Sequence, residues 1–411
     1  MSGSGLTVLI YRLLMTILAA KELATRLWAG DRQAVRARLG LLKLDKRGDR
    51  IWLHAASNGE LASVRPVIDA LLAQGRRLLI TVNTDSALEM AAGWELEGAD
   101  ICLAPIDLPG PTRRVLRNWQ ITAHVTLESD LWPIRILNTP GPVLVLGGRL
   151  TARSAKGWAR LHMLVRRMLA RVTYLSAQDS ASAERFAQAG LLQAAQGPVF
   201  DLKALYKPPQ SRPDAALEQC FDRAETWLAA STHDGEEDII LAAHTKALKT
   251  RPALKLIIAP RHPNRANEIS RLIESYGLTY ARRSSDDNPV PSQVYLADTL
   301  GEMHLWYALA GTTFVAGSLT DRGGHTPYEP AAFGSAILHG PDTSNFLAAY
   351  ERLTGANAAR CTLDADALCD ALLTLDTAEK QAKLGQAAQK VLHQDTDLKG
   401  LLRDITTALD A

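Results

Sequence analysis

The sequence predicts an α/β protein made of two doubly wound, Rossmann-like domains. From about residue 50 onward, short apolar runs alternate with helical patterns, which is typical of a parallel sheet with helices on both faces. The alternation stops at a proline-rich segment, YKPPQSRP at 206–213, and then restarts. The 411 residues suffice for two domains of ordinary size. We expect the two domains to face each other across a cleft that binds the ligand.

The first half supplies four of the expected buried strands. Apolar runs separated by helical stretches are typical of βαβ units. The strands are predicted at 51–56, 78–82, 121–127 and 143–146, and the helices at 61–74, 111–119, 155–170 and 178–189, with 155–170 basic and amphipathic.

The second half repeats this alternation after the proline-rich segment. Strands are predicted at 224–230, 254–260, 294–297, 312–316 and 336–339, followed by helical structure at 378–409. The predicted divisions are an N-terminal helix region (1–39), a first domain (40–205), a linker (206–216), a second domain (217–377) and a C-terminal helical segment (378–411). That last segment need not stay with the second domain.

Composition narrows the classes of function. With 47% hydrophobic and 22% charged residues the chain is an ordinary globular protein, and its net charge of +2 argues against a nucleic-acid binder. The four cysteines show no CxxC spacing, which favours a reducing, cytoplasmic compartment over a zinc site or disulfide framework. HxxxH, HExxH, GxGxxG and Walker A patterns are absent, so no bound metal, NAD(P) or ATP is expected.

The N-terminus combines an apolar run with basic residues. Residues 6–20 are strongly apolar, but Arg12 interrupts them, and the run is shorter than the ~20 residues that span a bilayer. Residues 1–50 hold ten Lys or Arg against four Asp or Glu. We expect a helix on the inner face of a membrane, with the basic residues on anionic lipid. The alternatives are a cleaved signal peptide and an ordinary docked helix with a solvated basic face.

The segment 315–330, VAGSLTDRGGHTPYEP, is the most informative part of the chain. Gly323 and Gly324 allow a bend with no Cβ in the way of a ligand. Pro327 suits the first turn of a helix, and Glu329 then lies inside that turn. A strand end, a glycine turn and a helix N-terminus make an anion site, and the carboxylate can accept hydrogen bonds from sugar hydroxyls. The local chemistry suggests a nucleotide sugar.

Two further strand ends in the second half favour anions. Arg261 and His262 follow the strand at 254–260 and suit a phosphate or carboxylate. Gly301, Glu302 and Met303 lie where a helix N-terminus would offer free N–H groups to a phosphate. The segment 231–237, STHDGEE, is another strand-to-helix junction, where Ser, Thr and Asp are good caps and a purely structural role is the alternative.

The first half places acids and arginines at its strand ends. After the strand at 51–56, Ser57 and Gly59 lead through a tight turn to Glu60, either a general base toward a sugar hydroxyl or a partner of the helix dipole. Glu128 and Asp130 follow the strand at 121–127 and either bind hydroxyls or cations or cap the next helix. The remaining pair, Arg149 and Arg153, suits carboxylate or phosphate, or simple surface solvation.

Together these motifs resemble the 3-deoxy-D-manno-octulosonic acid (Kdo) transferases, bacterial GT-B glycosyltransferases of lipopolysaccharide assembly. The resemblance runs from the N-terminal helix to about residue 346. The matching motifs are SxGE (Ser57–Glu60), LWP (Leu131–Pro133), RLxxRS (Arg149–Ser154), STHxGEE (Ser231–Glu237), PRHP (Pro260–Pro263), DTxGE (Asp298–Glu302) and GSLxxRGGHxPxEP (Gly317–Pro330).

The resemblance implies a donor, an acceptor and a mechanism. CMP-Kdo would bind the second domain, with Arg261 and the backbone of 301–303 on the phosphate and Glu329 on the ribose. Glu60 would deprotonate a glucosamine hydroxyl of a lipid A precursor, and the anomeric configuration would invert without a metal. The enzyme would work at the cytoplasmic face of the bacterial inner membrane. The implied donor-binding set also holds His262, Glu302, Gly323, Gly324, His325 and Thr326.

Several residues depart from the pattern of this family. Asn58, Asp130, Gly148 and Thr326 stand where it usually has a small apolar residue, Glu, Asn and Asn. The usual Asn after LWP is replaced by Ile134, and residues 196–201 also differ. Most departures lie in the acceptor half. Transfer of a related acidic sugar, transfer to a different lipid or glycan, and silent binding of a sugar nucleotide therefore remain alternatives.

Overall fold

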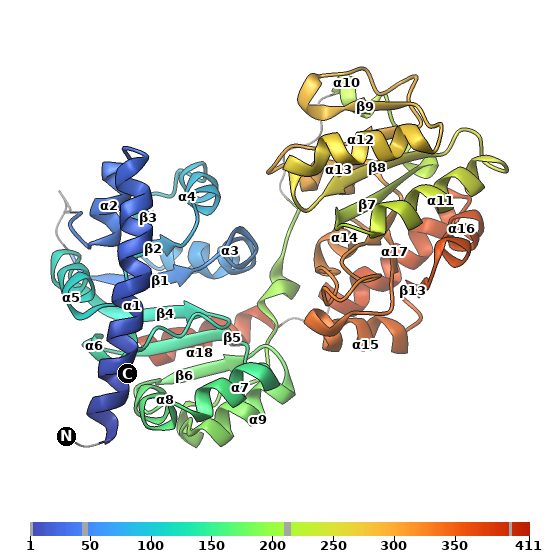
Figure 1. The fold of residues 1–411 in the computed structure, drawn as a ribbon. Coiled ribbons are helices and arrows are strands. Elements are labelled where there is room, and N and C mark those ends of the chain that lie inside the picture. The colour runs from blue at the N-terminus through green and yellow to red at the C-terminus, as the bar shows by residue number, and fades with distance from the viewer. Residues whose placement is uncertain (1–2, 43–47, 209–214, 394–396) are drawn as a thin grey trace. The chain divides into compact units, whose positions relative to one another are not determined.

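The computed structural model describes residues 3–42, 48–208, 215–393 and 397–411. The chain forms two compact units (Figure 1). The first comprises Met1–Leu205 together with Thr396–Ala411, and the second comprises Tyr206–Asp395. The change from one unit to the other at Tyr206 falls where the proline-rich segment begins. Most of that segment, 209–214, lies outside the described residues.

The first unit is built on a six-stranded sheet in which all pairs are parallel, in the order β3-β2-β1-β4-β5-β6. The four predicted strands are confirmed, but two more were missed. Both lack a clear apolar run: the edge strand β3 is only partly buried, and β6 has four residues that include a Tyr and a Ser. The strands are β1 (Arg50–Ala55), β2 (Leu78–Val82), β3 (Ala99–Leu103), β4 (Ile121–Leu127), β5 (Val143–Gly148) and β6 (Tyr174–Ala177).

Helices cover this sheet and close its crossover connections. They are α1 (Gly3–Trp28), α2 (Arg32–Arg38), α3 (Asn58–Ala73), α4 (Asp85–Ala92), α5 (Pro109–Asn118), α6 (Pro133–Asn138), α7 (Ala152–Ala159), α8 (His162–Leu169), α9 (Ser180–Ala189) and α18 (Leu398–Leu409), with 3-10 turns η1 (Gln193–Ala195) and η2 (Leu202–Leu205). The single helix predicted at 155–170 is wrong, because the chain turns at Arg160. This turn leaves α7 unburied and lets α8 bury Leu164, Val165, Met168 and Leu169.

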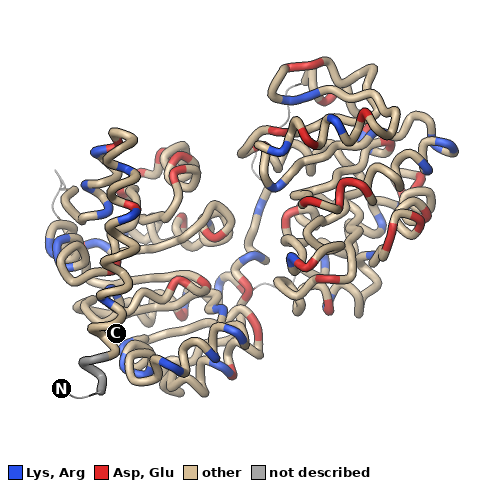
Figure 2. The backbone as a smooth tube through the Cα atoms, viewed as in Figure 1, with Lys and Arg blue, Asp and Glu red and all other residues tan. Residues whose placement is uncertain are grey.

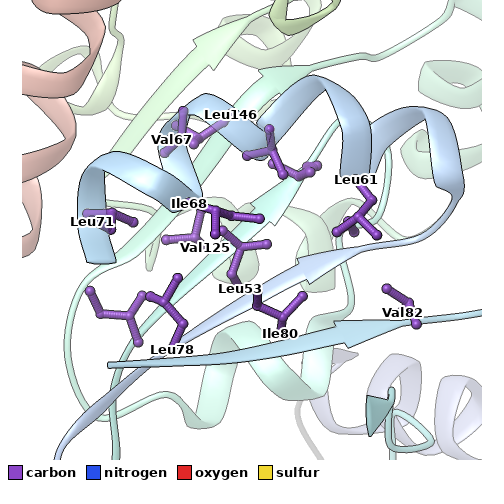
Figure 3. Packing of buried hydrophobic residues seen from close by; sticks show 14 of the residues in the cluster. Leu53, Leu61, Val67, Ile68, Leu71, Leu78, Ile80, Val82, Val125 and Leu146 are labelled. Carbon is purple, nitrogen blue, oxygen red and sulfur yellow. The ribbon is translucent and has the colours of Figure 1, made fainter. Parts of the chain in front are cut away.

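The core of the first unit lies between α3 and the sheet (Figure 3). Leu61 and Ile68 of α3 pack toward Leu53 and Val125, and all four side chains are fully buried. Ile405 of α18 joins the same core, so the last helix belongs to the first unit. The helical stretch predicted at 378–409 is thus two helices, and the residues between them, 394–396, lie outside the described part of the chain.

The second unit has a seven-stranded sheet with parallel pairs throughout, in the order β13-β12-β11-β7-β8-β10-β9. The five predicted strands are present, although the first begins at Thr226 because η3 (Arg223–Glu225) occupies the preceding residues. The two missed strands are edge pieces of three and two residues. The strands are β7 (Thr226–Thr232), β8 (Lys255–Pro260), β9 (Tyr280–Arg282), β10 (Val294–Leu296), β11 (Thr312–Val315), β12 (Ala336–His339) and β13 (Arg360–Cys361).

The helices of the second unit include several short ones at strand ends. They are α10 (Ala215–Glu218), α11 (Glu236–Leu248), α12 (Ala266–Ser275), α13 (Met303–Leu309), α14 (Tyr328–Ala332), α15 (Leu347–Gly355), α16 (Ala365–Thr374) and α17 (Ala378–His393), with 3-10 turns η4 (Pro263–Arg265), η5 (Arg283–Ser285) and η6 (Ser344–Phe346).

Each sheet has one point at which the strand order reverses. In the first unit the chain runs outward from β1 to β3 and then returns to place β4 beside β1. In the second unit the same reversal places β11 beside β7. Ligands of doubly wound sheets bind at the carboxyl ends of the strands at such a switch point. The residues after β1, β4, β7 and β11 are therefore the candidates for a site.

Candidate functional site

The switch point of the first unit carries Glu60 at the beginning of α3. The Ser57 side chain caps this helix by accepting a hydrogen bond from the Glu60 N–H. The Glu60 carboxylate turns back, and its Oε2 accepts a 2.8 Å hydrogen bond from the N–H of Ala56. Gly59 is the second residue of the helix and not part of the predicted tight turn, and a Cβ there would meet nothing within 4 Å.

A second carboxylate, Glu128, follows β4 on the other side of the switch point. Its backbone is left-handed (φ 47°), which is unusual for a residue other than glycine and typical of functional sites. Lys203 of η2 forms an ion pair with the Glu128 carboxylate. Burial, followed by the Glu128 charge, raises the pKa of Glu60 to about 8, although the Ala56 hydrogen bond and Lys203 oppose the change. Glu60 therefore titrates near neutral pH.

Asp130 is held by three neutral donors at the same strand ends. Its Oδ2 accepts hydrogen bonds from His54 Nε2 (3.0 Å), Asn83 Nδ2 (3.1 Å) and Trp132 Nε1 (3.3 Å). Burial raises the pKa of Asp130, but the hydrogen bonds from His54 and Trp132, with the charge of Arg135, outweigh it and hold the pKa below its usual range. Asp130 is thus a carboxylate at neutral pH, unlike Glu60.

A chain of buried side chains fixes the tautomer of His54. The Trp52 indole donates to Thr81 Oγ1 at 2.8 Å, and Thr81 Oγ1 lies 2.9 Å from His54 Nδ1. Burial lowers the pKa of His54 to about 4, so the ring is neutral. Because the Asp130 carboxylate can only accept, His54 carries its proton on Nε2 and accepts from the Thr81 hydroxyl at Nδ1. The alternative of Asp130 as a helix cap does not hold, because α6 is capped at Trp132 without a side-chain hydrogen bond.

Of the two predicted arginines, Arg149 lies at the end of β5 and Arg153 lies beyond it in α7. Arg149 is half-buried, and its N–H donates to the carbonyl of Glu128 at 3.1 Å, which ties the two loops together. Arg153 lies on the exposed helix α7. Packing within the first unit leaves little room for a side chain at Gly148, since a Cβ there would come within 3.0 Å of the Phe186 ring.

The switch point of the second unit brings together two histidines from different loops. His233 follows β7 and His325 follows β11, and their Nε2 atoms lie 2.9 Å apart with the rings 3° from parallel. Burial, followed by the charges of His233 and Arg261, lowers the pKa of His325 to about 4. His262 stands edge-on to His233, with ring centroids 6.0 Å apart. Ser231, at the end of β7, is left-handed (φ 61°), as Glu128 is in the first unit.

Two exposed arginines flank this histidine pair. Arg261 and Arg322 each contribute to lowering the pKa of His233, for which burial is the largest cause. Both side chains are exposed. In the described part of the chain, the Arg261 guanidinium has no hydrogen-bond or ion-pair partner. The arrangement suits a phosphate or a carboxylate.

The glycine pair is required by the protein's own packing. Gly323 and Gly324 have left-handed backbones (φ 81° and 70°). A Cβ on Gly323 would come within 2.5 Å of the Asn345 amide, and one on Gly324 within 2.9 Å of the Asp342 carbonyl oxygen. The segment 342–345 therefore requires glycine at both positions, and the role of this bend beside a ligand stays a prediction. Thr326 accepts a 3.4 Å hydrogen bond from the Tyr328 N–H at the beginning of α14.

The segment at 301–303 has a structural role that the sequence did not indicate. Gly301 is left-handed (φ 86°), and Met303 begins the seven-residue helix α13. The Glu302 carboxylate, however, forms a bidentate ion pair with Arg283 (2.7 and 3.1 Å), which lowers its pKa. Glu329 lies in the first turn of α14, as predicted, and its charge contributes to raising the pKa of Tyr206 after burial.

Sequence reasoning missed three groups at these sites. His54 and Lys203 contact the predicted acids, but neither stands beside them in the sequence. Glu236 was read only as part of a cap, whereas it is fully buried and hydrogen-bonded to a distant loop. The family-like spacing STHxGEE was the available signal for Glu236, and none of the local patterns marked Lys203.

Two further features of the described residues concern metal binding and the membrane. No group of three or more His, Cys, Asp or Glu residues that could hold a metal ion occurs among the described residues. Within the same residues, none of the helices has both the length and the apolar character needed to cross a membrane.

The chain is similar to known proteins over most of its length. A family described as 3-deoxy-D-manno-octulosonic-acid transferase (kdotransferase) matches residues 33–204. The 3-deoxy-D-manno-octulosonic acid transferase of Haemophilus influenzae is 30% identical over 374 residues, or 86% of each chain. The protein of the same name from Bordetella pertussis is 33% identical over 359 residues, or 82% of each chain.

Solved structures bear on the fold. A UDP-GlcNAc 2-epimerase from Neisseria meningitidis, bound to UDP-GlcNAc, is 12% identical and matches with a TM-score of 0.58, covering 88% of this chain and 99% of its own. At this identity the likeness shows the fold alone. It agrees with the prediction of two Rossmann-like domains of the GT-B type, which is confirmed.

Proposed function

Because this chain belongs to the 3-deoxy-D-manno-octulosonic acid transferase family, we propose that it transfers Kdo from CMP-Kdo to a lipid A precursor with inversion. Membership of the family makes it a glycosyltransferase. The donor, the acceptor hydroxyl and the catalytic base are the proposed part. One observation supports Glu60 as the catalytic base: its carboxylate lies at the switch point of the first unit, and its pKa is raised to about 8.

Glu60 supports the role of general base through its position and its titration. A base is most efficient when its pKa lies near the working pH, and burial beside Glu128 supplies that condition. In the proposed step, the Glu60 carboxylate takes the proton of a glucosamine hydroxyl. The oxygen then bonds to the anomeric carbon of Kdo, and the bond from that carbon to the phosphate oxygen breaks. CMP leaves with the bonding electron pair, and Glu60 ends protonated.

The second unit supports the donor assignment. The proposed ligand carries two anionic groups, the phosphate of CMP and the carboxylate of Kdo. Arg261 and Arg322 are exposed beside His233 and His325, so cationic and N–H groups converge at one switch point. Arg261 is assigned to the phosphate and Glu329 to the ribose. The leaving-group charge is then stabilised by these groups without a metal.

The surface of the first unit supports a membrane-bound acceptor. One side of α1 docks through Tyr11 with Asp107 (2.7 Å), Glu22 with Arg38 (2.6 Å) and Arg26 with Asp85 (2.8 Å). Between Leu9 and Leu18 the helix exposes six large apolar side chains, each 46–62% accessible: Leu9, Ile10, Leu13, Leu14, Ile17 and Leu18. We call these six residues the apolar face of α1.

Basic residues lie close to this helix. The neighbouring α8 packs against α1, and Lys and Arg are frequent on α1, α7 and α8 (Figure 2). An apolar face flanked by basic residues is typical of helices that lie in the plane of an anionic membrane surface. We therefore place the enzyme at the cytoplasmic face of the inner membrane, where a lipid A precursor presents its sugar hydroxyls.

A direct assay tests this function. Purified full-length protein is mixed with CMP-Kdo and a tetraacyl lipid A precursor, and lipid products are resolved by mass spectrometry. Formation of a Kdo-lipid and release of CMP are expected. CMP release with another lipid or glycan, and none with the lipid A precursor, would contradict the acceptor. CMP binding without turnover on any acceptor would instead identify a sugar-nucleotide binder.

A further inference from the structure

Glu236 is a buried carboxylate that binds four backbone N–H groups. It is the first residue of α11, and its side chain is fully buried. Its Oε2 accepts hydrogen bonds from the N–H of Gly317 (2.7 Å) and of His233 (3.0 Å). Its Oε1 accepts from the N–H of Ser318 and of Leu319, both at 3.0 Å. A carboxylate offers about four acceptor positions, so these contacts satisfy it completely.

These hydrogen bonds join the two loops at the switch point of the second unit. His233 belongs to the loop after β7, whereas Gly317–Leu319 begin the loop after β11. A buried charge is tolerated only when it is hydrogen-bonded or paired, and the N-terminal end of α11 adds a favourable dipole. Loss of the carboxylate would leave four N–H groups, two of them buried and two partly buried, without their acceptor, which is strongly unfavourable.

The fixed segment in turn positions His325. The Gly317 carbonyl accepts a 2.7 Å hydrogen bond from the Gly324 N–H, and the Ala316 carbonyl accepts a 3.1 Å hydrogen bond from the His325 N–H. Residues 316–317 thus hold the far end of the same loop. Because Glu236 binds both this loop and the His233 N–H, the contact between the His233 and His325 rings depends on it.

We propose that Glu236 is a positioning residue for the donor site, which sets the separation of the His233 and His325 loops through their backbone N–H groups. The inference rests on the proposed function, in which these loops receive the anionic groups of a CMP-sugar. Glu236 itself is buried and fully hydrogen-bonded, so it acts through the loops and not by touching the donor.

The next residue provides a matched control. Glu237 is 1% exposed, and it stands on the same turn of α11. Its carboxylate accepts hydrogen bonds from Thr232 Oγ1 (2.8 Å) and Arg265 Nη1 (2.7 Å). These partners lie outside the loop after β11. Glu237→Gln therefore removes a carboxylate that is as buried as that of Glu236, but it leaves the Gly317–Leu319 contacts in place.

The test compares Glu236→Gln, Glu236→Asp and Glu237→Gln in the full-length protein. The amide of Gln cannot accept at both ends, and Asp keeps the charge but is one methylene too short. We expect CMP to bind Glu236→Gln at least about 10-fold more weakly by titration calorimetry, the usual scale for lost charged hydrogen bonds. Glu236→Asp should fall between it and the wild type, and Glu237→Gln should bind CMP like the wild type. In turnover, the KM for CMP-Kdo should rise more than kcat falls.

A second readout does not depend on the donor assignment. The imidazole ¹⁵N resonances of His233 and His325 report whether their Nε2 contact persists. The Nε2 contact should be lost in Glu236→Gln and should persist in Glu237→Gln, where removal of the Glu237 charge lowers only the pKa of His233. Equal CMP affinity and unchanged histidine resonances in Glu236→Gln would overturn the proposal, as would equal losses in both Gln variants. If Glu236→Gln does not fold, Glu236→Asp decides by the same measurements. Absence of CMP binding by the wild type contradicts the donor assignment, and the histidine resonances then decide the positioning role.

Discussion

The Glu60 side chain folds back over the beginning of its own helix, where its Oε2 accepts a 2.8 Å hydrogen bond from the N–H of Ala56. This contact holds the carboxylate at the end of β1, where burial and then the Glu128 charge raise its pKa to about 8. The same environment that suits a general base also disfavours its ionised form. Removal of the Glu60 charge should therefore lower catalysis and raise stability.

The first prediction concerns transfer. Glu60→Gln and Glu60→Ala should lower kcat by at least ~100-fold, the usual scale for a lost general base, because neither side chain can take the acceptor proton. CMP affinity should remain unchanged, since the proposed donor groups lie in the second unit. Ser57→Ala is the control: it removes the cap of the same helix and costs about 1 kcal/mol of stability, yet it should retain most of the turnover. Undiminished transfer in Glu60→Gln would remove the base assignment.

The second prediction concerns the stability of the same variant. In the folded state the pKa of Glu60 is about 8, against an ordinary value of 4.5. A raised pKa gives stability that is fully present below the unfolded value and is lost as pH rises through the folded value. At pH 9 Glu60→Gln should therefore be more stable than the wild type, on the order of 1–2 kcal/mol after allowance for partial solvent exposure. Urea unfolding at pH 5 and pH 9 measures this, and a difference that does not grow with pH would contradict it.

The third prediction concerns Lys203, which forms an ion pair with Glu128. Lys203→Met removes a positive charge that lowers the pKa of Glu60 and leaves the Glu128 charge uncompensated. The acid limb of the pH profile of kcat/KM should move to higher pH, with activity about 10-fold lower at pH 7 and recovery at higher pH. Lys207→Met, at an exposed position four residues on, should leave the profile unchanged. A uniform loss of activity at every pH would show that Lys203 has a different role.

The fourth prediction concerns the chain of hydrogen bonds behind Asp130. In Thr81→Val the Trp52 indole loses its acceptor, and His54 Nδ1 loses the hydroxyl donor. Nδ1 then gains by taking the proton and donating to the Thr81 carbonyl 3.0 Å away, so the Nε2–H bond to Asp130 is lost.

The expected result is a change of the His54 tautomer in ¹⁵N spectra and a loss of about 1–3 kcal/mol of stability. Thr112→Val is the matched control. Thr112 is also fully buried, but its hydroxyl has no hydrogen-bond partner among the described residues, so its removal should be neutral or stabilising. Retention of the Nε2–H tautomer in Thr81→Val would show that Asp130 alone sets it.

The sequence predicted the elements that have strong apolar runs and missed those that do not. The buried central strands, such as β4 and β8, were found because parallel strands covered on both faces are continuously apolar. The edge strand β13 has two exposed residues and no periodic signal. The turn at Arg160 was missed because the basic, amphipathic pattern continues from α7 into α8, and only packing separates the two helices.

For the candidate sites, the sequence showed which loops hold the site residues but not which other residues contact them. Glu60 and Glu128 could be named because each follows a strand, and the parallel sheet brings such ends together. The Lys203 ion pair joins residues 75 positions apart, and three of the four Glu236 contacts span more than 80, so no local pattern shows them. Gly323 was predicted to keep a Cβ out of the way of a ligand, and the structure adds a reason that the sequence did not show: a Cβ there would collide with Asn345. Close packing of distant segments is the information that sequence spacing lacks.

The last prediction concerns α1 and requires a sharper design than removal of the N-terminus. Deleting residues 1–30 would abolish the apolar face of α1 together with the Tyr11, Glu22 and Arg26 contacts that dock this helix. A change in membrane binding could then reflect a damaged first unit. Substitutions on opposite sides of the helix separate the two effects, because Leu13 and Ile17 are 62% and 61% exposed whereas Tyr11 donates to the buried Asp107.

Burial of a Leu or Ile side chain is worth about 1.5–3 kcal/mol, so Leu13→Ser with Ile17→Ser should weaken binding to anionic vesicles by at least about 10-fold at an unchanged melting temperature. Tyr11→Phe should do the reverse: it removes a hydrogen bond to a buried carboxylate, which lowers the melting temperature, and it leaves the apolar face intact. Co-sedimentation with vesicles and thermal unfolding measure the pair. If the Leu13/Ile17 variant and the wild type bind vesicles equally, α1 either contacts the membrane through its basic residues or does not contact it. High salt separates these two outcomes, because it screens the charges and leaves apolar burial in place.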